Sequence, residues 1–227
     1  MLSVRLDTIL AEINAAWPSW QFRSLSRNRR WVETSSMEEP TRLAWRLRNQ
    51  PLVMKTQLVL SSLQTAADMA ARAHGGQSIR DTDIPYISHP VRVAMLVSNV
   101  FRCGDSEVAA AALLHDTLEK TTLTPDEILE NLGARVLHLV RAMTKDPGGS
   151  SKEYWKTLAA EVWEARLIKM ADALDHLDCP PEDLKRRLRS AKKAAELAYS
   201  NEAPLLTARR VLDEAMEAAV FRQGTHS

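Results

Sequence analysis

Residues 108–122 read VAAAALLHDTLEKTT and form the most informative stretch of the chain. The first seven are alanine, leucine and valine, a composition typical of a helix buried in a protein core. His115 and Asp116 follow at once, and Glu119 and Lys120 come one helical turn later. Either a core helix emerges into water at this point, or these side chains belong to a metal site. Residues elsewhere in the sequence must distinguish between these two interpretations.

Nearly all of the remaining sequence also predicts helices. The 227 residues include only 7 glycines, and no stretch shows the alternation of a strand. An amphipathic helix is expected at 2–16 and a short helix ending at Pro51. The longer helices are expected at 55–74, 90–102, 106–120, 124–131, 132–144, 151–160, 162–178, 181–200 and 204–222. The predicted fold class is therefore all-α.

A change in composition near residues 50–54 indicates a domain boundary. We expect a helical N-terminal extension at 1–53, a main helical domain at 54–200, and a C-terminal helix and tail at 201–227. Four of the six tryptophans lie within the first 50 residues. The extension is interpreted as a cap packed on the main domain, as a partner-binding or homo-oligomerising segment, or as a nucleic-acid contact through the arginines of 23–30.

Composition excludes several classes of protein. The 30 Lys and Arg nearly balance the 29 Asp and Glu, so no overall charge favours nucleic acid or an anionic membrane. Cys103 and Cys179 are far apart and lack the spacing of a thiolate zinc site. No apolar run approaches the roughly 20 residues of a membrane span, and acidic residues come too early for a secretory signal. A cytoplasmic protein is expected.

Further histidines and aspartates offer partners for His115 and Asp116. His89 lies in YISHP, and Asp172 and His176 lie in the apolar sequence ARLIKMADALDHL. A buried unpaired carboxylate costs several kcal/mol, so an aspartate on an apolar helix face indicates a counter-charge or a bound cation. Two histidines and two aspartates suit Mn²⁺ or another divalent ion that keeps positions open for water and phosphate.

The order H…HD…D resembles the HD-domain metal-dependent phosphohydrolases. The closest resemblance is to the hydrolase domain of RelA/SpoT homologues and the small alarmone hydrolases. It is carried by AADMAARAHGGQ (66–77), IPYISHPVRVAML (84–96), AALLHDTLEK (111–120), LGARVLHLVRAMTKD (132–146) and ARLIKMADALDHL (165–177). The resemblance implies a helical HD fold and removal of the 3′-pyrophosphate from (p)ppGpp or a related alarmone such as ppApp.

The resemblance also implies roles for individual residues. Glu119 matches an acid that positions or activates the attacking water. Arg80 and Lys169 match basic residues that bind the nucleotide and its phosphates. The metal ligands, typically for Mn²⁺, are His89, His115, Asp116 and Asp172.

Three departures from the family pattern bear on the substrate. Lys120 replaces the aspartate of a Glu-Asp pair; as a second catalytic residue it either binds an anionic substrate and alters specificity, or abolishes the usual mechanism. His176 replaces an asparagine; it is expected to contact substrate or to orient Asp172, the alternative being a partly exposed helix histidine. The basic helix after Pro181 has only Tyr199, at its end, to stack on a base.

Three functions remain open from these residues. The first is alarmone hydrolysis. The second is another HD-family reaction on nucleotides, such as that of a nucleoside monophosphate phosphatase. The third is a nucleotide-binding protein that keeps the fold and has lost turnover.

Overall fold

The computed structural model describes residues 23–25, 31–33, 39–146 and 148–224. The chain divides into two compact units, Met1–Thr56 and Gln57–Ser227. In the first unit, strands β1 (Arg23–Leu25) and β2 (Trp31–Glu33) pair antiparallel. These short strands were not expected in a helical extension; valine and tryptophan, both present in β2, favour strands. The helix predicted for residues 2–16 lies outside the described residues.

Helix α2 (Glu39–Ala73) is continuous. The expected end of a helix at Pro51, with a new helix from residue 55, is therefore wrong. A proline inside a helix removes one backbone donor, and here the helix continues past it. The domain boundaries at 53/54 and 200/201 stay predictions.

The second unit is all-α, as the sequence predicts. After α2 come two elements that together cover most of the helix expected at 90–102: α3 (Ser88–Met95) and the π-helix η2 (Leu96–Val100). The chain then forms α4 (Ser106–Leu114), α5 (Thr117–Lys120), α6 (Pro125–Met143), α7 (Ser151–Ala160), α8 (Trp163–Asp175), α9 (Pro181–Ala195) and α10 (Ala203–Gly224). None of the helices in the described part of the chain is both long and apolar enough to cross a membrane.

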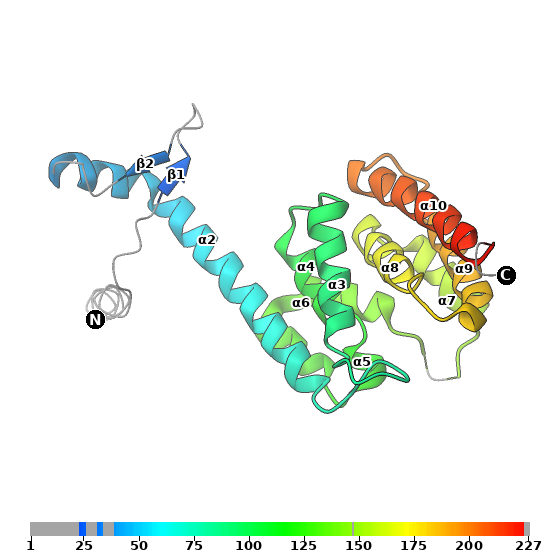
Figure 1. The fold of residues 1–227 in the computed structure, drawn as a ribbon. Helices are drawn as coiled ribbons and strands as arrows, with labels where there is room; N and C mark the ends of the chain where they lie inside the picture. Colours follow the sequence, from blue (N-terminus) through cyan, green and yellow to red (C-terminus); the bar gives the residue numbers. More distant parts are fainter. Residues whose placement is uncertain (1–22, 26–30, 34–38, 147, 225–227) are drawn as a thin grey trace. The chain divides into compact units, whose positions relative to one another are not determined.

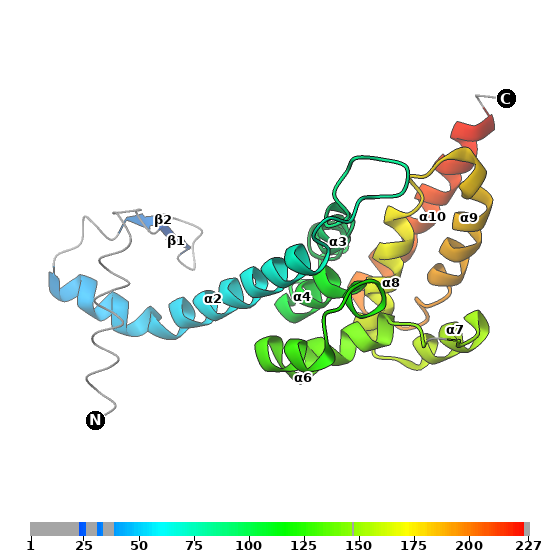
Figure 2. The same ribbon diagram turned by 90° about the horizontal axis from the view of Figure 1, so that it is seen from below.

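Helix α8 lies at the centre of this unit. It contacts α3, α4 and α6 on one side and α9 and α10 on the other, as Figures 1 and 2 show. Leu167, Ile168 and Met170 of α8 are fully buried. Helix α10 packs against both α8 and α9, so the C-terminal helix belongs to the same core. Helix α8 is therefore packed between two groups of helices.

Local signals in the sequence set several helix ends. Asp105 caps α4 by accepting hydrogen bonds from the backbone N–H groups of Glu107 and Val108. Thr124 and Glu127 form a reciprocal capping box at the start of α6. Gly133 has φ 86°, a left-handed value that glycine adopts readily, and it separates the two helical segments that the sequence predicts at 124–131 and 132–144.

One expected helix is broken where the candidate site begins. The sequence predicts a single helix over 106–120, but α4 ends at Leu114 and α5 begins at Thr117. His115 and Asp116 lie in the break. Neighbouring residues on a continuous helix point about 100° apart, so both could face one point only with a local distortion. The break supplies that distortion.

Candidate metal and phosphate site

Four side chains from three parts of the second unit converge on one point. His89 comes from α3, His115 and Asp116 from the break after α4, and Asp172 from α8. His89 Nε2 lies 3.5 Å from Asp116 Oδ2 and 3.4 Å from Asp172 Oδ1. His115 Nε2 lies 3.3 Å and 3.8 Å from the same two oxygens. The structure thus brings together the four residues that the sequence predicts as metal ligands.

Both histidines have Nδ1 engaged in a hydrogen bond, which leaves Nε2 as the nitrogen that can bind a metal. Nδ1 of His89 lies 2.7 Å from Asp175 Oδ2, and Nδ1 of His115 lies 2.8 Å from the backbone oxygen of Ala112. Because these partners are acceptors, each Nδ1 donates a hydrogen bond to its partner, and Nε2 is the ring nitrogen left for an ion that displaces its proton. Both Nε2 atoms are buried, and neither has a hydrogen-bond partner among the described residues. Buried nitrogens that face carboxylates without such a bond fit a divalent cation well.

The electrostatics of this cluster agree with a cation site. Burial opposes ionisation of Asp116 and Asp172, yet His115 beside the first and Lys169 beside the second hold the pKa of each carboxyl well below its usual range. Burial lowers the pKa of His89, but the nearby carboxylates of Asp116, Asp172 and Asp175 outweigh it and raise the pKa to about 10. The protein therefore gathers negative charge around a point that attracts a positive one.

Asp175 and Arg92 fix the Nδ1 side of the His89 ring, and the sequence reasoning missed both residues. Arg92 holds Asp175 through two hydrogen bonds of 2.6 and 2.9 Å, and Asp175 in turn holds His89. Asp175 comes three residues after Asp172 on α8, and Arg92 comes three residues after His89 on α3. That i, i+3 spacing was the available signal.

Lys120 and Tyr86 bind the outer side of Asp116. Lys120 Nζ lies 2.8 Å from Asp116 Oδ2, and the Tyr86 hydroxyl lies 2.5 Å from the same oxygen. The ammonium also donates to that hydroxyl at 2.5 Å. Tyr86 thus donates a hydrogen bond directly to a candidate metal ligand.

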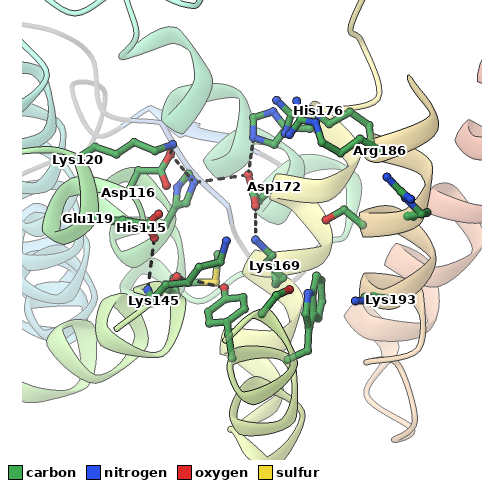
Figure 3. Close-up of a pocket in the computed structure, with 17 residues that line it drawn as sticks. His115, Asp116, Glu119, Lys120, Lys145, Lys169, Asp172, His176, Arg186 and Lys193 are labelled. Atoms are coloured by element: carbon green, nitrogen blue, oxygen red, sulfur yellow. Dashed lines mark hydrogen bonds and ion pairs between the residues drawn. The ribbon is translucent and has the colours of Figure 1, made fainter. Parts of the chain in front are cut away.

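A pocket of about 590 Å³ opens beside the His-Asp cluster (Figure 3). Its wall includes Glu119, whose Oε2 accepts a hydrogen bond of 3.3 Å from the backbone N–H of Lys145. Three carboxylates and seven basic side chains line it; the basic ones are Lys120, Lys145, Lys169, Arg186, Arg187, Arg189 and Lys193. Such an excess of positive charge suits a ligand with several phosphates.

Lys169, Arg187 and Arg80 occupy different positions around this pocket. Lys169 Nζ lies 2.7 Å from Asp172 Oδ2 and lines the wall, as predicted for a residue near phosphate. Arg187 also lines it, and its Nε is buried without a hydrogen-bond partner among the described residues. Arg80 is exposed, pairs with Asp81 at 3.1 Å, and does not line the pocket.

Two aromatic side chains of α7 form part of the pocket wall. The sequence offered only Tyr199, at the end of the basic helix that the structure shows as α9, as a residue that could stack on a base. Tyr154 and Trp155 line the pocket, and the ammonium groups of Lys169 and Lys193 lie 5.6 and 5.9 Å from the Trp155 ring centre. Tyr199 instead lies over Arg166, outside the pocket lining. The Tyr and Trp side chains that line the pocket therefore come from α7 and not from α9.

Comparison with known proteins places this site in a family. The family model of the HD domain matches residues 66–201. The chain belongs to the HD-domain family. That range contains His89, His115, Asp116 and Asp172, so the whole candidate cluster lies within the HD domain.

Several relatives of this HD-domain protein carry the same enzyme name. The human guanosine-3′,5′-bis(diphosphate) 3′-pyrophosphohydrolase MESH1 is 37% identical over 131 residues, which cover 54% of this chain and 73% of the relative. The protein of that activity name from Aquifex aeolicus is 38% identical over 122 residues, 51% of this chain and 17% of the relative. A solved structure described as a metazoan ortholog of SpoT that hydrolyzes ppGpp has a TM-score of 0.59 and 27% identity, covering 68% of this chain and 95% of that one.

Proposed function

We propose that this HD-domain hydrolase removes the 3′-pyrophosphate of guanosine 3′,5′-bis(diphosphate) or a related alarmone such as ppApp. The observation that carries the proposal is the pocket, where seven basic side chains face the His-Asp cluster. A bis(diphosphate) brings two diphosphate groups, and a nucleoside monophosphate brings one phosphate. The relatives named for this activity support the same choice.

The proposed cofactor is a divalent ion, with Mn²⁺ as the first choice. His89, His115, Asp116 and Asp172 would hold it, since two buried Nε2 atoms lack partners among the described residues and face the carboxylates. When bound, such an ion polarises a phosphoryl oxygen and makes water acidic enough to attack at neutral pH.

The side chains of the pocket would do the remaining chemistry. Hydrolysis adds water across the 3′-ester bond and yields inorganic pyrophosphate and a free 3′-hydroxyl. Glu119 is the proposed proton acceptor for the attacking water, because its carboxylate lines the pocket beside Asp116. Lys145 and Lys169 would balance the charge of the departing diphosphate.

The nucleoside would lie against the aromatic wall. Trp155 offers a flat surface in the wall of the pocket that His115 and Asp116 also line. Bases of any kind stack on such a ring, so this contact gives affinity without choosing guanine over adenine. The cytoplasm stays the proposed compartment, because Cys103 and Cys179 are both free. Homo-oligomerisation through 1–53 likewise stays a prediction.

A substrate panel tests the proposal. Purified protein with Mn²⁺ is incubated with ppGpp, ppApp and nucleoside monophosphates, and the release of pyrophosphate and of phosphate is followed. We expect pyrophosphate from the alarmones, lost in Asp116→Ala and kept in the surface control Asp126→Ala. Phosphate from monophosphates alone would support the phosphatase alternative, and binding without turnover would support a binding protein.

A further inference from the structure

Helix α9 builds a wall of the pocket on which every charged side chain is basic. It contributes four of the seven basic residues of the lining: Arg186, Arg187, Arg189 and Lys193. The three carboxylates of the lining come from α5, from α8 and from the break before α5. Figure 3 shows Arg186 and Lys193 on the side of Asp172 away from Lys120. The pocket therefore has a basic wall apart from the lysines that adjoin the His-Asp cluster.

The spacing of the side chains makes this wall continuous. Arg189, Ser190 and Lys193 follow Arg186 by three, four and seven residues, so all four share one face of α9. Arg186 already pairs with Asp183 at 2.9 Å. Arg189 and Lys193 form no ion pair with any acid in the described part of the chain. Two cations about one helical turn apart are thus left without a negative partner.

Arg187 adds to this positive charge beside the same face. Its Nε is buried without a hydrogen-bond partner among the described residues. Burial, followed by the charge of neighbouring Arg186, lowers the pKa of Arg187. Like charges this close repel one another, so a multivalent anion among them would be stabilising. Phosphate oxygens are the ligands that arginine and lysine bind best in this way.

Trp155 connects the α9 wall to the His-Asp cluster. Its ring centre lies 5.9 Å from Lys193 Nζ and 5.6 Å from Lys169 Nζ. Lys169 in turn contacts Asp172 at 2.7 Å, and His176 Nε2 lies 3.3 Å from the other oxygen of Asp172. A nucleoside stacked on Trp155 would therefore have both the cluster and the α9 wall within reach.

We propose that the α9 wall, mainly through Arg189 and Lys193, binds the 5′-diphosphate of the substrate while the 3′-diphosphate lies at the His-Asp cluster. This inference rests on the proposed function, which assigns Lys145 and Lys169 to the departing 3′ group. The charges of α9 then remain for the second diphosphate of the same ribose. Arg80 does not take that role, because it is exposed outside the pocket lining. The chain should therefore select nucleotides by their 5′-phosphates.

Binding of GDP tests this subsite without turnover, because GDP carries a 5′-diphosphate and no 3′-phosphate. In the Mn²⁺-loaded full-length protein, Arg189→Gln/Lys193→Gln should bind GDP about tenfold more weakly than the wild type by isothermal titration calorimetry. Lys185→Gln/Lys192→Gln is the matched control and should keep the wild-type Kd, since both lysines are exposed on α9 and do not line the pocket. Arg189→Gln alone, with a smaller loss, serves if the double variant does not fold.

Two results of this titration would overturn the subsite. Wild-type GDP affinity in the Arg189→Gln/Lys193→Gln variant would place the 5′-diphosphate elsewhere. An equal loss in the control variant would mean that only the overall charge of α9 matters.

Steady-state kinetics extend the test to substrates. With ppGpp, Arg189→Gln/Lys193→Gln should raise KM about tenfold and leave kcat nearly unchanged, because a contact far from the reacting bond stabilises ground and transition states alike. Guanosine 3′-diphosphate, which has no 5′-phosphate, should give the same KM in the variant and the wild type. An equal rise of KM for both substrates would contradict a 5′-specific subsite.

The outcome is separable from that of the substrate panel. Weaker GDP binding in the variant without any alarmone hydrolysis would keep the α9 subsite and reject the proposed reaction. Alarmone hydrolysis with the same KM for ppGpp in the variant and the wild type would keep the reaction and reject the subsite.

Discussion

The ammonium of Lys120 lies 2.8 Å from Oδ2 of Asp116, the oxygen that also faces the Nε2 atoms of His89 and His115. A cation therefore already occupies one side of a proposed metal ligand. The family pattern has an aspartate at this position, whereas in this chain Lys120 neutralises the negative charge of Asp116. Lys120 would therefore act on the proposed metal centre through Asp116, as well as on any phosphate in the pocket.

Removing this ammonium should tighten metal binding. In Lys120→Gln we expect the Mn²⁺ affinity to rise by about tenfold, because a divalent ion and an ammonium on one carboxylate repel each other. Isothermal titration calorimetry measures the change. Lys145→Gln is the matched control, since Lys145 lines the same pocket and has no ion pair with Asp116 in the described structure. A weaker Mn²⁺ affinity in Lys120→Gln would mean that Lys120 supports the centre.

Asp175 should set the metal affinity of His89 without touching the ion. In Asp175→Asn, Nδ1 of His89 loses the carboxylate that fixes its proton, and we expect Mn²⁺ affinity to fall by about 10- to 100-fold. Arg92→Gln should give a smaller loss, and the double variant should lose less than the sum because both residues act on one ring. Asp178→Asn, an exposed acid nearby, is the control. Additive losses would show that Arg92 acts elsewhere.

Trp155 should contribute to substrate affinity more than to turnover. Stacking of a base on an aromatic ring is worth about 1–3 kcal/mol, so Trp155→Ala should raise KM by roughly 5- to 150-fold with little change in kcat. Trp155→Phe keeps a ring and should recover most of the affinity. Steady-state kinetics with ppGpp and ppApp should show similar losses for both. A loss confined to one base would assign Trp155 to base recognition by edge contacts.

Much of the site could be predicted because its chemistry is carried by residues that are costly in a core. His89, His115, Asp116 and Asp172 stand out from apolar surroundings, and the motifs that contain them occur in the family's order. The structure brings these four together, with both histidine Nε2 atoms near Asp172 Oδ1.

Other features depend on contacts that the sequence does not encode locally. The break at His115 separates α4 from α5 within a run of good helix formers, because tertiary contacts override propensity there. Trp155 lies on a helix that no motif links to the site, and only packing brings α7 to the pocket. Arg80 matched a family position by sequence, yet its loop leaves the guanidinium exposed.

Asp105 caps α4, the helix that leads directly into His115. Burial opposes ionisation of Asp105, but hydrogen bonds from Arg135 and from the backbone N–H of Glu107 outweigh it and lower the pKa of this carboxyl below 3.8. A carboxyl whose pKa is lower in the folded state stabilises the fold above the unfolded value, and that contribution is lost as the pH falls below 3.8 towards the folded pKa.

Asp105→Asn should therefore flatten the acid limb of the stability curve. Asparagine can still cap the helix, so the loss isolates the charge that Arg135 contacts at 2.8 Å. Urea unfolding measured from neutral pH down to about pH 3 should show a free energy of unfolding that falls less steeply in the variant than in the wild type. Asp126→Asn, an exposed acid in the first turn of α6, is the control and should keep the wild-type slope. Equal slopes in Asp105→Asn and the wild type would show that this ion pair does not contribute to acid stability.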